Sequence, residues 1–266
     1  MQRLKNIPAA LPEAEEIDIQ ALKQSLADGS VELVCVLGPT ASGKTKYAVA
    51  LARELGGEII SADSRQVYRG MDIGTGKDLA EYGAIPYHVI DVANPGEGYN
   101  VFRFKEDFER AYGDIRSRGA VPILCGGTGL YINAVTTGYD FRSHKPLSEP
   151  VKGAAGPAMT PKTFFIGTLV SREVRNARID ARLDARLQEG MVDEIKGLLD
   201  SGVPAATLIS YGLEYKYVTL YLTGALDYSA MREKLAVAIH QFAKRQMTWF
   251  RGMERSGTVI HWTTVR

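Results

Sequence analysis

The segment GPTASGKT, residues 38–45, is the feature that most restricts what this chain can fold into. It satisfies the pattern G-x-x-x-x-G-K-[ST], between an apolar run, VELVCVL, and a segment of helical character, KTKYAVALAREL. Glycines let backbone N–H groups turn inward around phosphate oxygens, and the following helix adds the positive end of its dipole. The sequence therefore predicts a P-loop that binds the phosphate end of a small molecule.

The rest of the chain repeats the alternation of strand and helix. Apolar runs at 58–61, 87–92, 121–125 and 163–170 read as buried strands, and segments 101–118 and 129–136 read as helices. Such alternation is typical of a parallel sheet covered on both faces. We therefore expect an α/β, P-loop NTPase-like three-layer fold with a parallel sheet. From Ser171 onward we expect a helical C-terminal part, closed by an edge strand at 258–265, and a short leading helix is expected within 13–28.

Length and composition are those of a globular protein. The 266 residues are 45% hydrophobic and 24% charged, with no apolar run long enough to span a bilayer and no apolar stretch of the secretory type at the N-terminus. We therefore expect a cytoplasmic protein without a membrane partner. Cys35 and Cys125 lie in apolar runs without metal-ligand spacing, so both are interpreted as small buried hydrophobes.

Charge is distributed unevenly along the chain. The net charge is only +1, but residues 1–140 carry 14 Lys+Arg against 19 Asp+Glu, whereas residues 141–266 carry 18 against 12. A basic C-terminal half is compatible with a polyanionic partner, and equally with solvated helix faces.

Two further segments carry chemistry next to the P-loop. Asp63 ends the run EIISAD, at the carboxyl edge of a strand where ligands collect in open α/β sheets. P-loop enzymes need a carboxylate in such a place for the metal or the attacking group, although Asp63 is also a common turn former. GGTGLYINA, from Gly126, is a second Gly-rich turn, in which Thr128 is a candidate for a second phosphate or the metal.

Together these motifs resemble one family, the tRNA dimethylallyltransferases, also called tRNA isopentenyltransferases. The matching blocks stand in the family's order from Gly38 to Arg251: GPTASGKT, ISADSRQVYRGMDIGTGK, GGTGLY, SREVRNARIDARL and AKRQMTWFR. The resemblance implies transfer of a dimethylallyl group from dimethylallyl diphosphate to N6 of an adenine in the tRNA anticodon loop, with release of pyrophosphate. The P-loop would then hold the leaving pyrophosphate without consuming ATP.

The resemblance also implies roles for particular residues. Asp63 is the expected base that takes a proton from the adenine amine, a poor nucleophile. Charge on the departing pyrophosphate would be stabilised by Lys44, by Thr45 with Mg²⁺, and by Thr128 and Arg172. The expected diphosphate contacts are Gly38, Thr40, Ala41, Ser42, Gly43, Lys44, Thr45 and Arg172.

Acceptor contacts are expected from two segments. Ser64, Gln66 and Tyr68 follow the base and resemble the family's adenine-side residues. Lys244, Arg245 and Gln246 lie on a late basic and aromatic helix of a kind that can contact RNA. The neighbouring aromatic residues Phe242, Trp249 and Phe250 are interpreted as core.

The chain departs from the family between the two halves of the core. Family members carry a helical insertion that grips the anticodon stem, and here a Pro- and Gly-rich linker replaces it. We therefore divide the chain into an N-terminal helical extension (1–30), a P-loop catalytic core (31–138), the linker (139–161) and a C-terminal core strand with helices (162–266). We expect the protein to act as a monomer.

Because the RNA grip is missing, three alternatives stay open. Free adenine nucleotides such as AMP need no clamp, so an adenylate isopentenyltransferase is one. A P-loop small-molecule kinase and a chain that binds RNA or diphosphate without turnover are the others.

Overall fold

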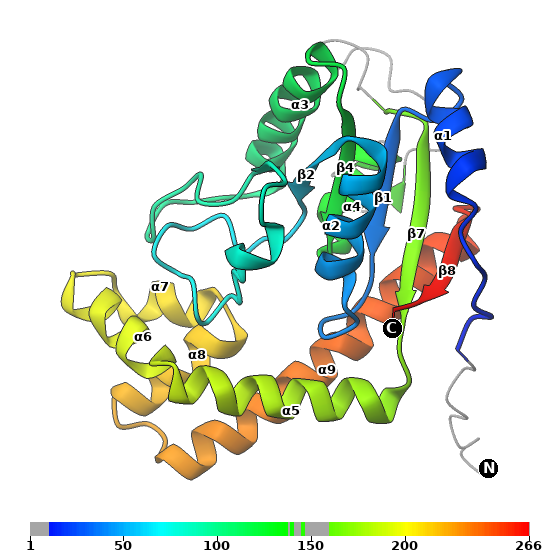
Figure 1. The fold of residues 1–266 in the computed structure, drawn as a ribbon. Coiled ribbons are helices and arrows are strands. Elements are labelled where there is room, and N and C mark those ends of the chain that lie inside the picture. The colour runs from blue at the N-terminus through cyan, green and yellow to red at the C-terminus, as the bar shows by residue number, and fades with distance from the viewer. Residues whose placement is uncertain (1–10, 138, 141–144, 147–159, 266) are drawn as a thin grey trace.

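A six-stranded parallel sheet forms the centre of the protein, as a computed structural model of the chain shows (Figure 1). The structure describes residues 11–137, 139–140, 145–146 and 160–265. The strand order is β3-β2-β4-β1-β7-β8, and all neighbours are parallel. The strands are β1 (Leu33–Leu37), β2 (Gly57–Ser61), β3 (Tyr87–His88), β4 (Val121–Gly126), β7 (Thr163–Leu169) and β8 (Ile260–Thr264).

Helices cover both faces of this sheet, which gives the three layers predicted from the sequence. On one face, α1 (Ile19–Ala27) and α2 (Lys44–Leu55) pack on a cluster that includes Val34, Val36 and Ile166. On the other face, α3 (Val101–Ser117) and α4 (Gly129–Thr136) bury Phe104 and Ile132 against the opposite side of the same strands. Apolar residues on both faces explain why the strand sequences are continuous apolar runs.

The C-terminal part is helical and lies below the carboxyl edge of the sheet in Figure 1. It consists of α5 (Arg172–Gln188), α6 (Met191–Asp200), α7 (Ala205–Ser210), α8 (Leu213–Leu222) and α9 (Tyr228–Arg255). The long helix α9 packs against α5 and α8 and leads back to β8, which pairs with β7 at the edge of the sheet. These helices therefore face the loops that follow the strands.

The predicted elements are confirmed with three differences. The leading helix begins only at Ile19, where the Asp18 carboxylate accepts hydrogen bonds from Gln20 N–H and Ala21 N–H and caps it. The strand expected at 87–92 ends at His88, because Val89 and Asp91 have φ angles of 61° and 56°, outside the range of a strand. Part of the expected linker forms a short hairpin, β5 (Tyr139–Asp140) with β6 (Lys145–Pro146). Most of the rest of that linker lies outside the described residues.

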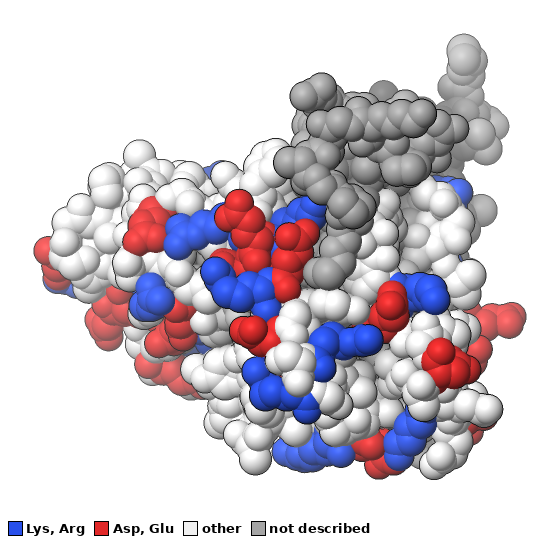
Figure 2. All heavy atoms as spheres, turned by 90° about the horizontal axis from the view of Figure 1, so that it is seen from above, with Lys and Arg blue, Asp and Glu red and all other residues white. Residues whose placement is uncertain are grey.

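The face of the molecule opposite the P-loop carries charges of both signs. Figure 2 views this face from the top of Figure 1, and basic and acidic side chains lie beside one another on it. Arg118, just after α3, donates to both carboxylate oxygens of the buried Glu58 on β2, at 3.1 and 2.8 Å. This pairing lowers the pKa of Glu58, and His88 adds a third hydrogen bond to the same carboxylate. No helix in the described part of the chain is long and apolar enough to cross a bilayer.

Candidate active site

A cavity of about 300 Å³ opens at the carboxyl ends of β1, β2 and β4. The α/β fold predicts a ligand site at this edge of the sheet. The P-loop, the loop after β2, and helices α5, α8 and α9 all contribute to its wall. Its wall includes Thr40, Ala41, Gly43, Lys44, Thr45, Asp63, Arg65, Gln66, Thr75, Gly76, Arg178, Arg182, Arg186, Glu214 and Phe242.

The P-loop is shaped by two residues with positive φ, Ala41 at 62° and Gly43 at 83°. Gly43 is also the N-cap of α2 and has no side chain to satisfy the first N–H groups of that helix, which remain available to an anion. Behind the loop, a Cβ on Gly38 would lie 2.2 Å from Thr168 Oγ1, so only glycine fits there. Thr168 in turn shares a 2.6 Å hydrogen bond with Ser42 Oγ.

A side chain from α9 ties the P-loop to the second Gly-rich turn. Gln246 accepts a 2.8 Å hydrogen bond from Thr40 N–H and donates a 3.0 Å bond to Gly127 O. Gly127 permits this approach, because a Cβ there would lie 2.2 Å from Gln246 Nε2. The C-terminal helix thus fixes two loops that come from different strands.

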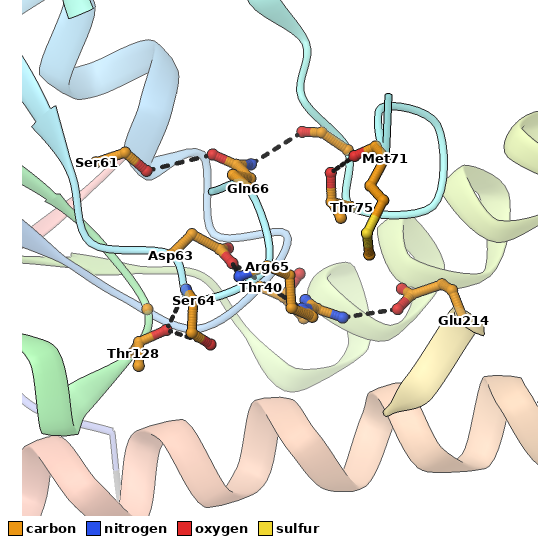
Figure 3. Close-up of polar contacts among 12 residues, drawn as sticks. Thr40, Ser61, Asp63, Ser64, Arg65, Gln66, Met71, Thr75, Thr128 and Glu214 are labelled. Atoms are coloured by element: carbon orange, nitrogen blue, oxygen red, sulfur yellow. Dashed lines mark hydrogen bonds and ion pairs between the residues drawn. The ribbon is translucent and has the colours of Figure 1, made fainter. Parts of the chain in front are cut away.

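Asp63 lies beside the P-loop on the turn after β2. Its Oδ1 accepts a 3.0 Å hydrogen bond from Arg65 N–H, and its side chain is 22% exposed (Figure 3). The next residue is held by Thr128, the N-cap of α4, whose Oγ1 accepts from Ser64 N–H at 3.1 Å. The carboxylate of Asp63 is therefore kept at the cavity wall by its own loop and by the GGTG turn.

A buried ion pair closes the cavity on the side of α8. Arg65 Nη1 donates to Glu214 Oε2 at 2.7 Å and stacks over the ring of Phe242, while Arg186 Nη1 lies 3.9 Å from Glu214 Oε1 (Figure 3 shows the Arg65 contact). Burial, followed by repulsion from Arg182, lowers the pKa of Arg186 to about 10. Glu214 thus compensates two buried guanidinium groups, of which Arg65 also lies 3.9 Å from Asp63 Oδ1 through its Nε.

Three cations of the cavity are left without such compensation. Within the described part of the chain, Lys44 Nζ, Lys46 Nζ and the Arg178 guanidinium make no hydrogen bond or ion pair. Burial lowers the pKa of Lys44, which shows that the unbound site disfavours its charge. Lys44 would therefore gain most from an anionic ligand, whereas Arg178 is exposed and would approach that ligand from solvent.

Comparison with known proteins agrees with this geometry. The family described as IPP transferase matches residues 66–154 and 141–253, and the one described as Isopentenyl transferase matches 31–82. The tRNA dimethylallyltransferase 1 of Porphyromonas gingivalis is 49% identical over 280 residues, which cover 86% of this chain and 93% of the relative. That of Parabacteroides distasonis is 47% identical over 283 residues, covering 88% and 92%. The chain belongs to the tRNA dimethylallyltransferase family.

Solved structures of this dimethylallyltransferase family share the fold. The full-length tRNA isopentenylpyrophosphate transferase of Bacillus halodurans superposes with a TM-score of 0.75 at 31% identity, over 88% of this chain and 89% of that one. The tRNA delta(2)-isopentenylpyrophosphate transferase of Staphylococcus epidermidis gives 0.74 at 30% identity, over 87% and 92%. The P-loop NTPase-like fold expected from the sequence is therefore confirmed.

This dimethylallyltransferase chain is shorter than its relatives. In the alignment of 280 residues with the P. gingivalis protein, 86% of the 266-residue chain amounts to about 229 residues, so about 50 positions have no residue here. The two IPP transferase matches meet at 141–154, inside the predicted linker.

Most predicted diphosphate contacts line the cavity, but three do not. Thr40, Ala41, Gly43, Lys44 and Thr45 lie in its wall, whereas Gly38 and Ser42 support the turn from behind. Arg172, the first residue of α5, is exposed and outside the wall. Arg178, Arg182 and Arg186 recur every fourth residue on one helix face, and Arg172 lies about 120° around the axis from Arg178. Arg172 therefore lies apart from the cavity arginines, and its assignment to the diphosphate stays a prediction.

The predicted acceptor residues divide in the same way. Gln66 lines the cavity, where it donates to Gly76 O at 3.2 Å. Ser64 and Thr128 hold each other outside it, so in this structure Thr128 contacts the loop after β2, and its predicted role toward the ligand stays a prediction. Tyr68 is buried against Tyr211, with ring centroids 4.6 Å apart, and burial raises its pKa to about 12. Tyr68 therefore lies outside the cavity wall, and its contact with the acceptor stays a prediction.

Helix α9 carries the remaining predicted residues. Lys244 and Arg245 are exposed, as an RNA contact requires, but the Gln246 side chain is buried on the P-loop. Phe250 is core as expected, whereas Phe242 lines the cavity and Trp249 is 37% exposed. Cys35 and Cys125 are both buried, and burial raises the pKa of Cys125 to about 12.

Proposed function

We propose that this chain transfers a dimethylallyl group from dimethylallyl diphosphate to N6 of an adenine in the tRNA anticodon loop. The observation that carries the proposal is the shared cavity, in which Asp63 faces the P-loop and the arginines of α5. A carboxylate beside a diphosphate cradle is the arrangement that alkyl transfer to a weak nitrogen nucleophile requires.

The donor diphosphate would bind at the N-terminus of α2. There the free N–H groups and the uncompensated Lys44 and Arg178 meet phosphate oxygens. As the allylic C–O bond breaks, negative charge grows on the pyrophosphate, and these fixed cations stabilise it more than they stabilise the bound donor.

Magnesium fits the same place. Among the described residues no cluster of three His, Cys, Asp or Glu side chains could hold a metal. Mg²⁺, however, commonly takes one or two protein ligands together with substrate phosphates. The Thr45 hydroxyl lines the cavity and would hold the ion, which would neutralise part of the diphosphate charge.

Asp63 would act on the acceptor side. As the N6–C bond forms, the amine loses a proton, and we assign that proton to the Asp63 carboxylate. Its Oδ1 already accepts the Arg65 N–H, which leaves Oδ2 to face the amine. Gln66, in the same wall, is placed to contact the base.

The names of the relatives favour tRNA as the acceptor over AMP, and the P-loop kinase hypothesis gains no support from them. With a tRNA acceptor we also propose a cytoplasmic location. A monomer would suffice, because one chain supplies every residue of the cavity named above.

Incubation with labelled dimethylallyl diphosphate and Mg²⁺ tests the proposal. The acceptors are unmodified tRNA, AMP and ATP, and the control is a tRNA whose anticodon-loop adenine is replaced by guanine, which lacks the 6-amino group. We expect label in the unmodified tRNA alone. Label in AMP or ATP and none in tRNA would replace the proposal with an adenylate isopentenyltransferase.

A further inference from the structure

Glu194, in the first turn of α6, makes an unusual set of contacts for a partly exposed carboxylate. Its Oε2 accepts hydrogen bonds from Asp72 N–H and Ile73 N–H, both at 2.7 Å, and its Oε1 accepts from Gly74 N–H at 3.0 Å. Tyr215 on α8 donates to the same Oε1 at 2.7 Å. Three consecutive backbone N–H groups of a distant loop thus converge on one side chain, in charge-assisted bonds of the stronger kind.

The loop held in this way continues directly into the cavity wall. Thr75 and Gly76 line the cavity, although Glu194 itself does not. Gly76 O accepts from Gln66 Nε2 at 3.2 Å and from Arg182 Nη2 at 3.3 Å. Figure 3 shows Gln66 between Asp63 and the loop that carries Thr75. One carbonyl therefore orients a predicted acceptor contact and a cavity arginine together.

Close packing against α8 and α5 also restricts the backbone of the loop. A Cβ on Gly74 would lie 2.9 Å from the Tyr215 ring, and one on Gly76 would overlap the Arg186 guanidinium. The loop must approach both helices with its bare backbone. Loops of this kind are the mobile parts of active sites unless a scaffold fixes them.

We propose that Glu194 is a positioning residue for the transfer reaction, which fixes loop 72–76 so that Gly76 O holds Gln66 and Arg182 around Asp63. This role rests on the proposed function. The P-loop is held separately, by Gln246 and Thr168, and Arg182 is also paired with Asp78, so the donor site keeps these contacts without Glu194. The effect of losing the carboxylate falls on the rate of the bound complex.

The test compares Glu194→Ala and Glu194→Gln with Asp193→Asn, an exposed neighbour on the same helix. For the alanine variant we expect kcat to fall about 100-fold, since a misplacement of about 1 Å costs that much. The KM for dimethylallyl diphosphate should stay within about threefold of the parental value, because the P-loop contacts are intact. Glutamine should restore about a tenth to a third of the parental kcat, because one amide oxygen still accepts two of the N–H groups. The asparagine control should match the parent.

Amide hydrogen exchange of residues 72–74 gives a readout that needs no turnover. Protection in the parental chain, its loss in Glu194→Ala and its partial return in Glu194→Gln support the role. Parental kcat in a folded Glu194→Ala variant with rapid exchange at these amides would overturn it, as would equal losses in kcat and donor affinity. A parental chain that protects these amides but transfers no prenyl group overturns the proposed function itself.

Discussion

Replacing Gln246 by alanine tests whether α9 holds the P-loop or touches the tRNA. The change removes the acceptor for Thr40 N–H and the donor for Gly127 O, and Gln246 is buried. An unsatisfied buried polar group costs about 1–3 kcal/mol. Because Thr40 lines the cavity, water can partly satisfy its N–H, so the loss of both hydrogen bonds should lower the free energy of unfolding by about 2–3 kcal/mol. For a chain of this size that loss lowers Tm by about 4–12 °C.

The same substitution should weaken donor binding. Without its anchor, the turn from Thr40 to Thr45 no longer presents its N–H groups in one orientation, so we expect the KM for dimethylallyl diphosphate to rise about tenfold. Initial rates at saturating tRNA, together with thermal unfolding, measure both effects.

Lys244→Ala is the matched control, because Lys244 is exposed two residues earlier on the same helix. It should leave Tm and the donor KM unchanged. If Gln246→Ala kept the parental Tm and donor KM and raised only the KM for tRNA, the side chain would contact the acceptor and the structural account of α9 would be wrong.

Three further results are expected. Arg178→Ala should lower kcat/KM about 100-fold through lost charge stabilisation, whereas Arg172→Ala should stay within about twofold; comparable losses in both would contradict the placement of α5. Burial lowers the pKa of Lys44 in the free site, and bound diphosphate should raise it again. Donor affinity should therefore be highest below the pKa of Lys44 in the free site and decline as the pH rises through that pKa, which lies below that of an ordinary lysine. Isothermal titration with pyrophosphate between about pH 7 and 10 measures this decline, and an affinity that does not change with pH would count against the prediction. Chelation of Mg²⁺ should abolish transfer, and addition of Mg²⁺ should restore transfer. Full activity in EDTA would show that the reaction does not need the ion.

The fold was predictable because its signals are local. The apolar runs that became β1, β4 and β7 are buried on both faces, and the P-loop pattern determined both a strand end and a helix start. The early end of β3 was not predictable, since the positive φ values of Val89 and Asp91 arise in residues that seldom adopt them.

Residues of the site were predictable only where a reactive side chain stands in a recognisable motif or at the end of a strand, as Lys44 and Asp63 do. The arginines of α5 that line the cavity, Arg178, Arg182 and Arg186, recur at a four-residue spacing that places them on one face, a signal that the sequence does carry. Glu194 and Glu214 left no such signal. Their partners are the backbone of residues 72–74 and the side chain of Arg65, more than a hundred residues away in the sequence, and only the tertiary fold brings them together.

The central claim is that Asp63 accepts the proton of the adenine amine while the P-loop retains the diphosphate. Single-turnover transfer from dimethylallyl diphosphate to tRNA by Asp63→Asn measures it most directly, because asparagine keeps the shape and the hydrogen bond to Arg65 N–H but cannot take the proton. A rate about 10²- to 10⁴-fold below the parental rate, with pyrophosphate affinity unchanged, is the result we predict. Transfer at the parental rate would contradict it.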